Sequence, residues 1–173
     1  MKRLKPLFLI LLTLALVSCG TNSNYTQNNL NKNFYNGKTI YFMYGYDSKD
    51  FISYKGMHAS VLGPDLPPDV KKVFRESIEE LATETKLNLK VADNLDNIND
   101  PSAVLVYVNI KEILWSFGFS VATLKTDVKY TIKPSYKEYN TIGIRKSGGG
   151  DPSNNVRKSL KVATYNFLKE LEK

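Results

Sequence analysis

The chain is poor in the residue types that build disulfide frameworks, zinc sites and histidine-based catalytic sites. Its 173 residues include one cysteine, Cys19, and one histidine, His58. One cysteine excludes an intrachain disulfide, and zinc sites take several His or Cys ligands at set spacings. We therefore expect no metal site and no cofactor, and a fold stabilised by its hydrophobic core.

Because the chain has a single histidine, any histidine-dependent active site must use it. A Ser/His/Asp triad would have to include His58, yet the local sequence Met57-His58-Ala59-Ser60 is no nucleophile elbow, because Gly-x-Ser-x-Gly is absent. A general base also needs partner groups, which the sequence does not identify. We expect a non-catalytic protein, and an envelope hydrolase that uses His58 stays as the alternative.

No apolar run in the N-terminal region is long enough to cross a bilayer, which takes roughly 20 residues as a helix. The apolar segment Leu7 to Val17 follows the basic residues Lys2, Arg3 and Lys5. A basic segment followed by a short apolar one is typical of an export signal. The run ends at Cys19.

The residues Leu16-Val17-Ser18-Cys19 resemble the lipobox of bacterial lipoproteins. The resemblance implies cleavage before Cys19 and acylation of that residue, which attaches the protein to a membrane. It divides the chain into a signal peptide (1–18), an acylated N-terminus with a flexible tether (19–36) and one domain (37–173). An ordinary secretory signal with an incidental cysteine is the alternative.

The charge pattern excludes nucleic acid as a partner. Removing residues 1–18 takes away three basic side chains and leaves 21 Lys and Arg against 17 Asp and Glu, a net charge of +4. Acidic and basic residues are mixed along the chain, whereas nucleic-acid binders gather basic residues on one face. Residues 20–36 are rich in Asn, Ser and Thr, which favours a flexible tether.

Periodicity predicts an α+β domain with the element order β-α-β-β-β-β-α. Alternating apolar residues predict strands, and stripes three or four residues apart predict helices. The expected strands are 38–46, 87–91, 102–114, 119–132 and 139–145, and the expected helices are 70–86 and 156–171. We expect a two-layer sandwich in which a mixed or antiparallel sheet of about five strands carries both helices on one face.

Two polar segments resemble ligand loops only superficially. Asp93 to Asp100 fails the calcium-loop pattern, because Leu95 occupies a ligand position and no glycine follows. Ser147 to Asp151 is rich in glycine but lacks both phosphate-loop spacings. We interpret the first as a polar turn and the second as a connection that leads to a helix capped by Asp151.

The irregular segment 47–68 is the expected binding loop, because binding residues concentrate on loops held by a rigid scaffold. The candidate partner-binding residues are Phe51, Tyr54, Met57 and His58. The alternative is an insertion that covers a sheet edge. The aromatic residues of the first strand and of Trp115 to Phe119 also leave two interpretations open, a packed core edge or an exposed apolar patch.

From Pro68 onward the order of elements resembles small bacterial outer-membrane lipoproteins, including the auxiliary lipoproteins of lipid transporters and the lipopolysaccharide-assembly lipoprotein. In those families a helix like 70–86 precedes strands like 87–91 and 103–114 and a long hairpin, and the transporter auxiliaries end in a helix. The resemblance implies a lipid-anchored envelope protein, on the outer membrane facing the periplasm, that binds a protein partner or lipid. Only Cys19 carries over as a functional residue.

Overall fold

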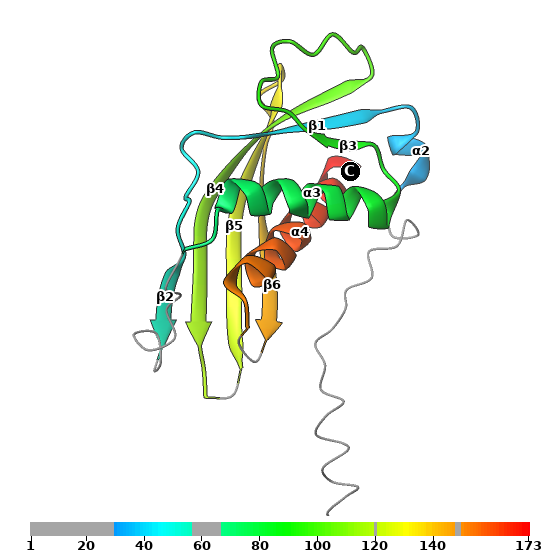
Figure 1. Cartoon of the computed structure of the whole chain (residues 1–173). Coiled ribbons are helices and arrows are strands. Elements are labelled where there is room, and N and C mark those ends of the chain that lie inside the picture. Colours follow the sequence, from blue (N-terminus) through cyan, green and yellow to red (C-terminus); the bar gives the residue numbers. More distant parts are fainter. Residues whose placement is uncertain (1–29, 57–66, 120, 148–149) are drawn as a thin grey trace, which may run out of the picture.

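A computed structural model describes residues 30–56, 67–119, 121–147 and 150–173 (Figure 1). In this part of the chain no helix is long and apolar enough to cross a membrane. The elements are α2 (Lys32–Tyr35), β1 (Thr39–Tyr44), β2 (Ser53–Gly56), α3 (Val70–Thr85), β3 (Leu89–Val91), β4 (Ala103–Phe117), β5 (Ala122–Lys133), β6 (Glu138–Ser147) and α4 (Pro152–Leu171).

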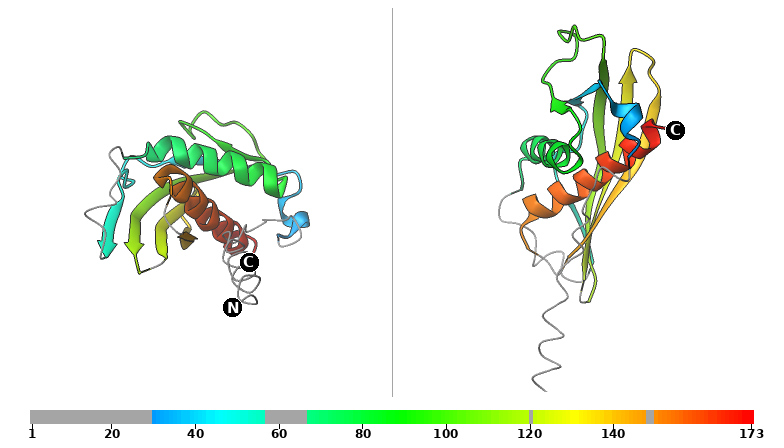
Figure 2. Two further views of the ribbon diagram at one scale, coloured as in Figure 1. Left: turned by 60° about the horizontal axis from the view of Figure 1, so that its bottom comes forward. Right: turned by 90° about the vertical axis from the view of Figure 1, so that its right-hand side faces the viewer.

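One mixed sheet carries α3 and α4 on the same face, which confirms the predicted α+β sandwich (Figures 1 and 2). The strand order is β3-β1-β4-β5-β6, and β2 pairs with the far half of β4. β1 runs parallel to both neighbours, while β4, β5 and β6 form an antiparallel meander. The strand missing from the prediction is β2, whose four residues are too few for periodicity to show.

The long strand β4 changes its inward-facing set at a bulge between Ile110 and Glu112. Before the bulge Val108 and Ile110 are buried, and after it Ile113 and Trp115 are buried. A bulge inserts one unpaired residue and so shifts the two-residue alternation of a strand. With this shift Trp115 and Phe117 face the core, and the strand continues to Phe117, whereas we expected it to end at residue 114.

Helix α3 follows the prediction closely. The side chain of Asp69 accepts a hydrogen bond from the backbone N–H of Lys72 at 2.9 Å, which caps the helix. The helix ends at Thr85, and the cap residue Lys86 has a φ of 56°, in the left-handed region. Its buried stripe includes Val73, Phe74, Ile78 and Leu81.

Helix α4 packs lengthwise on β5 and β6. Asp151 caps it as predicted, accepting from the N–H groups of Ser153 and Asn154, and Pro152 is its first residue. The Phe167 ring stacks on the Tyr130 ring of β5, with the centroids 4.3 Å apart and the planes at 9°. Both side chains are fully buried, so α4 is part of the core.

Residues 30–36, which we expected to belong to the flexible tether, pack against the domain. Leu30 and Tyr35 are buried. The Tyr35 hydroxyl donates to the Leu168 carbonyl, and the Asn31 N–H donates to Glu172 Oε2 at 2.7 Å. The domain boundary predicted at residue 37 is therefore wrong, since an Asn-rich segment with only a few large apolar side chains still docks on α4.

Candidate functional site

One residue of the predicted binding loop, Tyr54, packs against two aromatic rings of β4. Tyr54 on β2 lies 6.3 Å from the Phe117 ring at an interplanar angle of 11°, and 6.2 Å from the Trp115 ring. Trp115 and Phe117 are buried, at 2% and 9% exposure. For these two rings the core interpretation is confirmed. The parallel pairing of β2 with β4 places Tyr54 beside them.

The other predicted loop residues have different surroundings. Phe51 is half exposed, and the Lys49 ammonium lies 5.2 Å from its ring centroid. Met57 and His58 lie outside the described residues, as does Cys19. Phe51 thus offers an accessible ring, whereas Tyr54 is fixed by packing. The hydrolase alternative stays a hypothesis, because His58 lies outside the described residues.

A groove on the sheet face opposite the helices, which we call the outer groove, is a concave site with a mostly apolar lining. It has a volume of about 600 Å³, which lies in the range of small-molecule sites. Its lining residues are Met43, Asn94, Leu95, Asp96, Ile98, Leu105, Tyr107, Lys133, Pro134 and Tyr136.

One wall of the outer groove is the connection between β3 and β4. Leu95 is only 5% exposed and fixes this connection to the sheet. The Asn94 side chain accepts from the N–H of Asp96 at 2.8 Å, and Asp100 accepts from the N–H of Ser102 at 2.8 Å. These short-range bonds are those of a polar turn, as predicted.

The opposite wall is the β5–β6 hairpin. The Lys133 ammonium lies 4.4 Å from the centroid of the Tyr136 ring, and that ring is 64% exposed. The floor comes from the outer face of the sheet, where Met43 of β1 is paired with Tyr107 of β4. The exposed ring of Tyr136, the ammonium group of Lys133 and an apolar floor therefore lie together at this site.

Tyr107 joins the groove floor to the segment after β1. Its hydroxyl donates to Asp47 Oδ1 at 3.0 Å and accepts from the N–H of Tyr46 at 3.1 Å. Burial and the hydrogen bond to Asp47 raise the pKa of Tyr107, and the same hydrogen bond lowers the pKa of Asp47. The phenol thus stays protonated near neutral pH, because it starts from a pKa of about 10.

The lining of the outer groove suits binding by shape and apolar contact. It contains one cation, Lys133, and one carboxylate, Asp96, beside mostly apolar side chains. Among the residues that the structure describes, no group of three His, Cys, Asp or Glu side chains could hold a metal ion. The sequence analysis did not predict this groove. One signal was present, because Leu105 and Tyr107 put large side chains on the second face of the expected strand 102–114, which indicates that both faces of this strand are partly covered.

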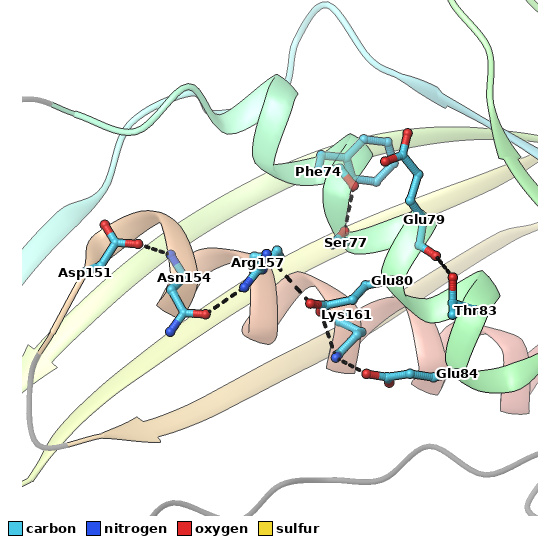
Figure 3. Close-up of polar contacts among 10 residues, drawn as sticks. All are labelled: Phe74, Ser77, Glu79, Glu80, Thr83, Glu84, Asp151, Asn154, Arg157 and Lys161. Carbon is cyan, nitrogen blue, oxygen red and sulfur yellow. Dashed lines mark hydrogen bonds and ion pairs between the residues drawn. The ribbon is translucent and has the colours of Figure 1, made fainter.

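The densest ionic cluster lies between the two long helices, on the opposite face of the sheet (Figure 3). Lys161 of α4 contacts Glu80 Oε2 at 2.8 Å and Glu84 Oε1 at 2.7 Å, and it is only 7% exposed. Arg157 lies 3.7 Å from Glu80 and donates to Asn154 Oδ1 at 2.9 Å. Each acidic member pairs with a basic one, which indicates a clamp between α3 and α4.

Comparison with known proteins gives little information about function. No protein-family model matches the sequence, and no curated protein matches it. A solved structure titled an uncharacterized protein is 10% identical with a TM-score of 0.40, covering 77% of this chain and 92% of its own. A PelC dodecamer from Paraburkholderia phytofirmans is 8% identical with a TM-score of 0.37, covering 72% and 82%. The hypothetical protein CT253 from Chlamydia trachomatis is 12% identical with a TM-score of 0.36, covering 78% and 94%. Similarity at this level assigns no function.

Proposed function

We propose that the protein is a non-catalytic lipoprotein of the bacterial cell envelope, anchored through Cys19, whose α+β domain binds an apolar chain in the outer groove. The observation that carries the proposal is the position of Cys19 directly after a basic segment and a short apolar run. Two or more acyl chains give stable anchoring, because each buried CH₂ adds about 0.8 kcal/mol.

The position of the domain supports this arrangement. The described fold begins at Leu30, and ten residues separate it from Cys19. As a coil these residues would have a root-mean-square span of roughly 16 to 19 Å. The domain would thus sit close to the membrane surface, where lipids and membrane-bound proteins are the nearest partners.

The chemistry of the outer groove supports an apolar ligand. Leu95, Ile98, Leu105 and Pro134 provide aliphatic contacts, and Tyr136 provides an exposed ring. With one cation and one carboxylate in the lining, charge alone does not select the ligand. An acyl chain of a lipid and an apolar protein segment share the required chemistry.

Fractionation of a Cys19→Ala variant tests the anchor. We expect the variant to be unprocessed or released from the membrane fraction, while the control Ser18→Ala, which keeps a small residue before the cysteine, stays processed and membrane-bound. A Cys19→Ala protein that is processed and fractionates like wild type would remove the lipoprotein assignment.

A charge placed in the outer groove tests the ligand. We expect Ile98→Glu to abolish binding of a fluorescent fatty acid, whereas Thr123→Glu, on the outer face of β5, should leave it unchanged. If wild type binds no fatty acid but retains an envelope protein that Ile98→Glu loses, the ligand is a protein segment. Equal behaviour of both variants in both assays would contradict the proposed site.

A further inference from the structure

The edge of the sheet formed by β6 is long and open. β6 spans Glu138–Ser147, and in the described part of the chain it pairs with β5 alone. The other edge strands are short, since β3 has three residues and β2 has four. An exposed long edge is a template for pairing with a further strand unless something blocks it.

The residues of β6 that face this open edge follow from the hydrogen-bond pattern. The Ile132 N–H donates to the Lys137 carbonyl in the hairpin, so the odd-numbered residues of β6 are the ones bonded to β5. The even-numbered residues then direct their backbone groups outward. Consistent with this, the Ile142 carbonyl accepts from the Asn166 side chain at 3.0 Å rather than from β5.

Two of the even-numbered residues of β6 also have exposed apolar side chains. Ile142 is 43% exposed and Ile144 is 52% exposed, both on the sheet face opposite the helices. A groove of about 780 Å³ runs beside the edge, between Tyr139 to Ile142 of β6 and the last turns of α4. A strand added at this edge would lie beside that groove and place its own side chains next to both isoleucines.

The sequence of β6 is complementary to itself in one antiparallel register. With the twofold axis at Ile142, that residue faces its own copy, and Asn140 faces the second copy's Ile144. Glu138 faces the second copy's Lys146 on one side of the sheet, and Tyr139 faces the second copy's Arg145 on the other. Opposite charges and cation–ring pairs stabilise cross-strand neighbours, and the twofold axis makes each contact twice.

We propose that two copies of this chain associate through their β6 strands, which join antiparallel about Ile142 into one continuous sheet. The carbonyl of Ile142 has two lone pairs, so it can accept from the second strand with or without Asn166. The charged ends, Glu138 and Lys146, disfavour parallel pairing, because like charges would then lie opposite each other.

Disulfide trapping on the purified full-length protein tests this contact. Residues paired in this way have Cα atoms about 5.5 Å apart, which suits a disulfide. We expect oxidation to convert Ile142→Cys to a covalent dimer at least tenfold more than wild type, which sets the background. The matched control is Lys125→Cys, which lies on the same sheet face but on the interior strand β5. Dimer formation equal to that of wild type or of the control would overturn the proposal, as would cross-linking of Ile142→Cys in membranes only to a different protein.

A charge swap tests the register. Glu138→Lys and Lys146→Glu should each weaken dimerisation in sedimentation by roughly fivefold or more, because each places like charges opposite each other twice. The double variant should restore it. Glu138 also pairs with Lys129 within the subunit, and the double variant does not restore that contact, so recovery reports the interface. A double variant as weak as the single ones would contradict the register.

Discussion

Gly143 of β6 lies directly beneath the Ser159 carbonyl of α4, so close that a Cβ on Gly143 would be 1.8 Å from that oxygen. The adjoining Thr126 hydroxyl lies 3.0 Å from Ser159 Oγ, which ties the same turn of the helix to β5. The absence of a side chain at position 143 therefore sets how closely α4 approaches the sheet.

Gly143→Ala should destabilise the fold by about 3 kcal/mol, at or beyond the upper end of ordinary overpacking, because the obstacle is backbone. Chemical denaturation of wild type and variant measures this difference. Thr131→Ala, at a part-buried position on the outer face of β5, is the control and should change the free energy of unfolding by less than about 1 kcal/mol. A Gly143→Ala midpoint equal to that of the control would show that α4 can move away freely.

Phe167→Ala should cost about 3 to 5 kcal/mol of stability. The ring is fully buried and contacts three other rings, those of Phe42, Tyr130 and Tyr139. Denaturation in urea measures the loss, with Lys158→Ala on the same helix as the control. An unchanged midpoint for Phe167→Ala would mean that the helix is peripheral to the fold.

Lys161→Met should destabilise the protein by about 1 to 3 kcal/mol, since it leaves Glu80 and Glu84 close together without their shared ammonium. Lys173→Met removes an exposed ion pair with Glu170 and should change stability by less than about 1 kcal/mol. Thermal unfolding of the two variants distinguishes the clamp from an ordinary surface pair. Equal melting temperatures would contradict the role of Lys161.

Stability should fall as the pH rises above about 10. Burial raises the pKa of Tyr44 to about 12, and burial also raises the pKa of Tyr130. Burial lowers the pKa of Lys161, but its hydrogen bonds to Glu80 and Glu84 outweigh this, so the net shift is upward. Above about pH 10 the unfolded chain therefore binds fewer protons than the folded one, and each such group removes up to about 1.4 kcal/mol per pH unit.

Urea denaturation between about pH 8 and 12 measures this loss, since that window begins below the ordinary tyrosine pKa and reaches the raised pKa of Tyr44. Tyr130→Phe removes one of the contributing groups, so its stability should fall less steeply with pH than that of wild type. If the free energies of unfolding of wild type and Tyr130→Phe fell with identical slopes, the buried phenol would not be a source of the alkaline instability.

The sequence predicted the elements whose apolar residues repeat over several turns or pleats. Both long helices and five strands follow from such repeats, and Asp69 and Asp151 cap their helices as expected. β2 was not predicted, because it is short and its pairing with β4 joins residues about 60 positions apart. Such long-range pairing leaves no local signal.

The outer groove was also not predictable, because its lining comes from four separate segments: β1, the β3–β4 connection, β4 and the β5–β6 hairpin. Leu95 and Ile98 sit in a polar run, where two isolated apolar residues gave no period. The docking of residues 30–36 depended on a few contacts with α4, such as Asn31 with Glu172, that composition does not encode. Phe51 was predicted as a contact residue and is accessible, while its role in binding stays a prediction.

The most direct test of the proposed function is the intact mass of the protein purified from membranes. From the lipoprotein proposal we predict a chain that begins at Cys19 and carries a diacylglyceryl group on its sulfur, with a mass above that of residues 19–173 by the lipid alone. A chain of unmodified mass, or one that begins at any other residue, would contradict it.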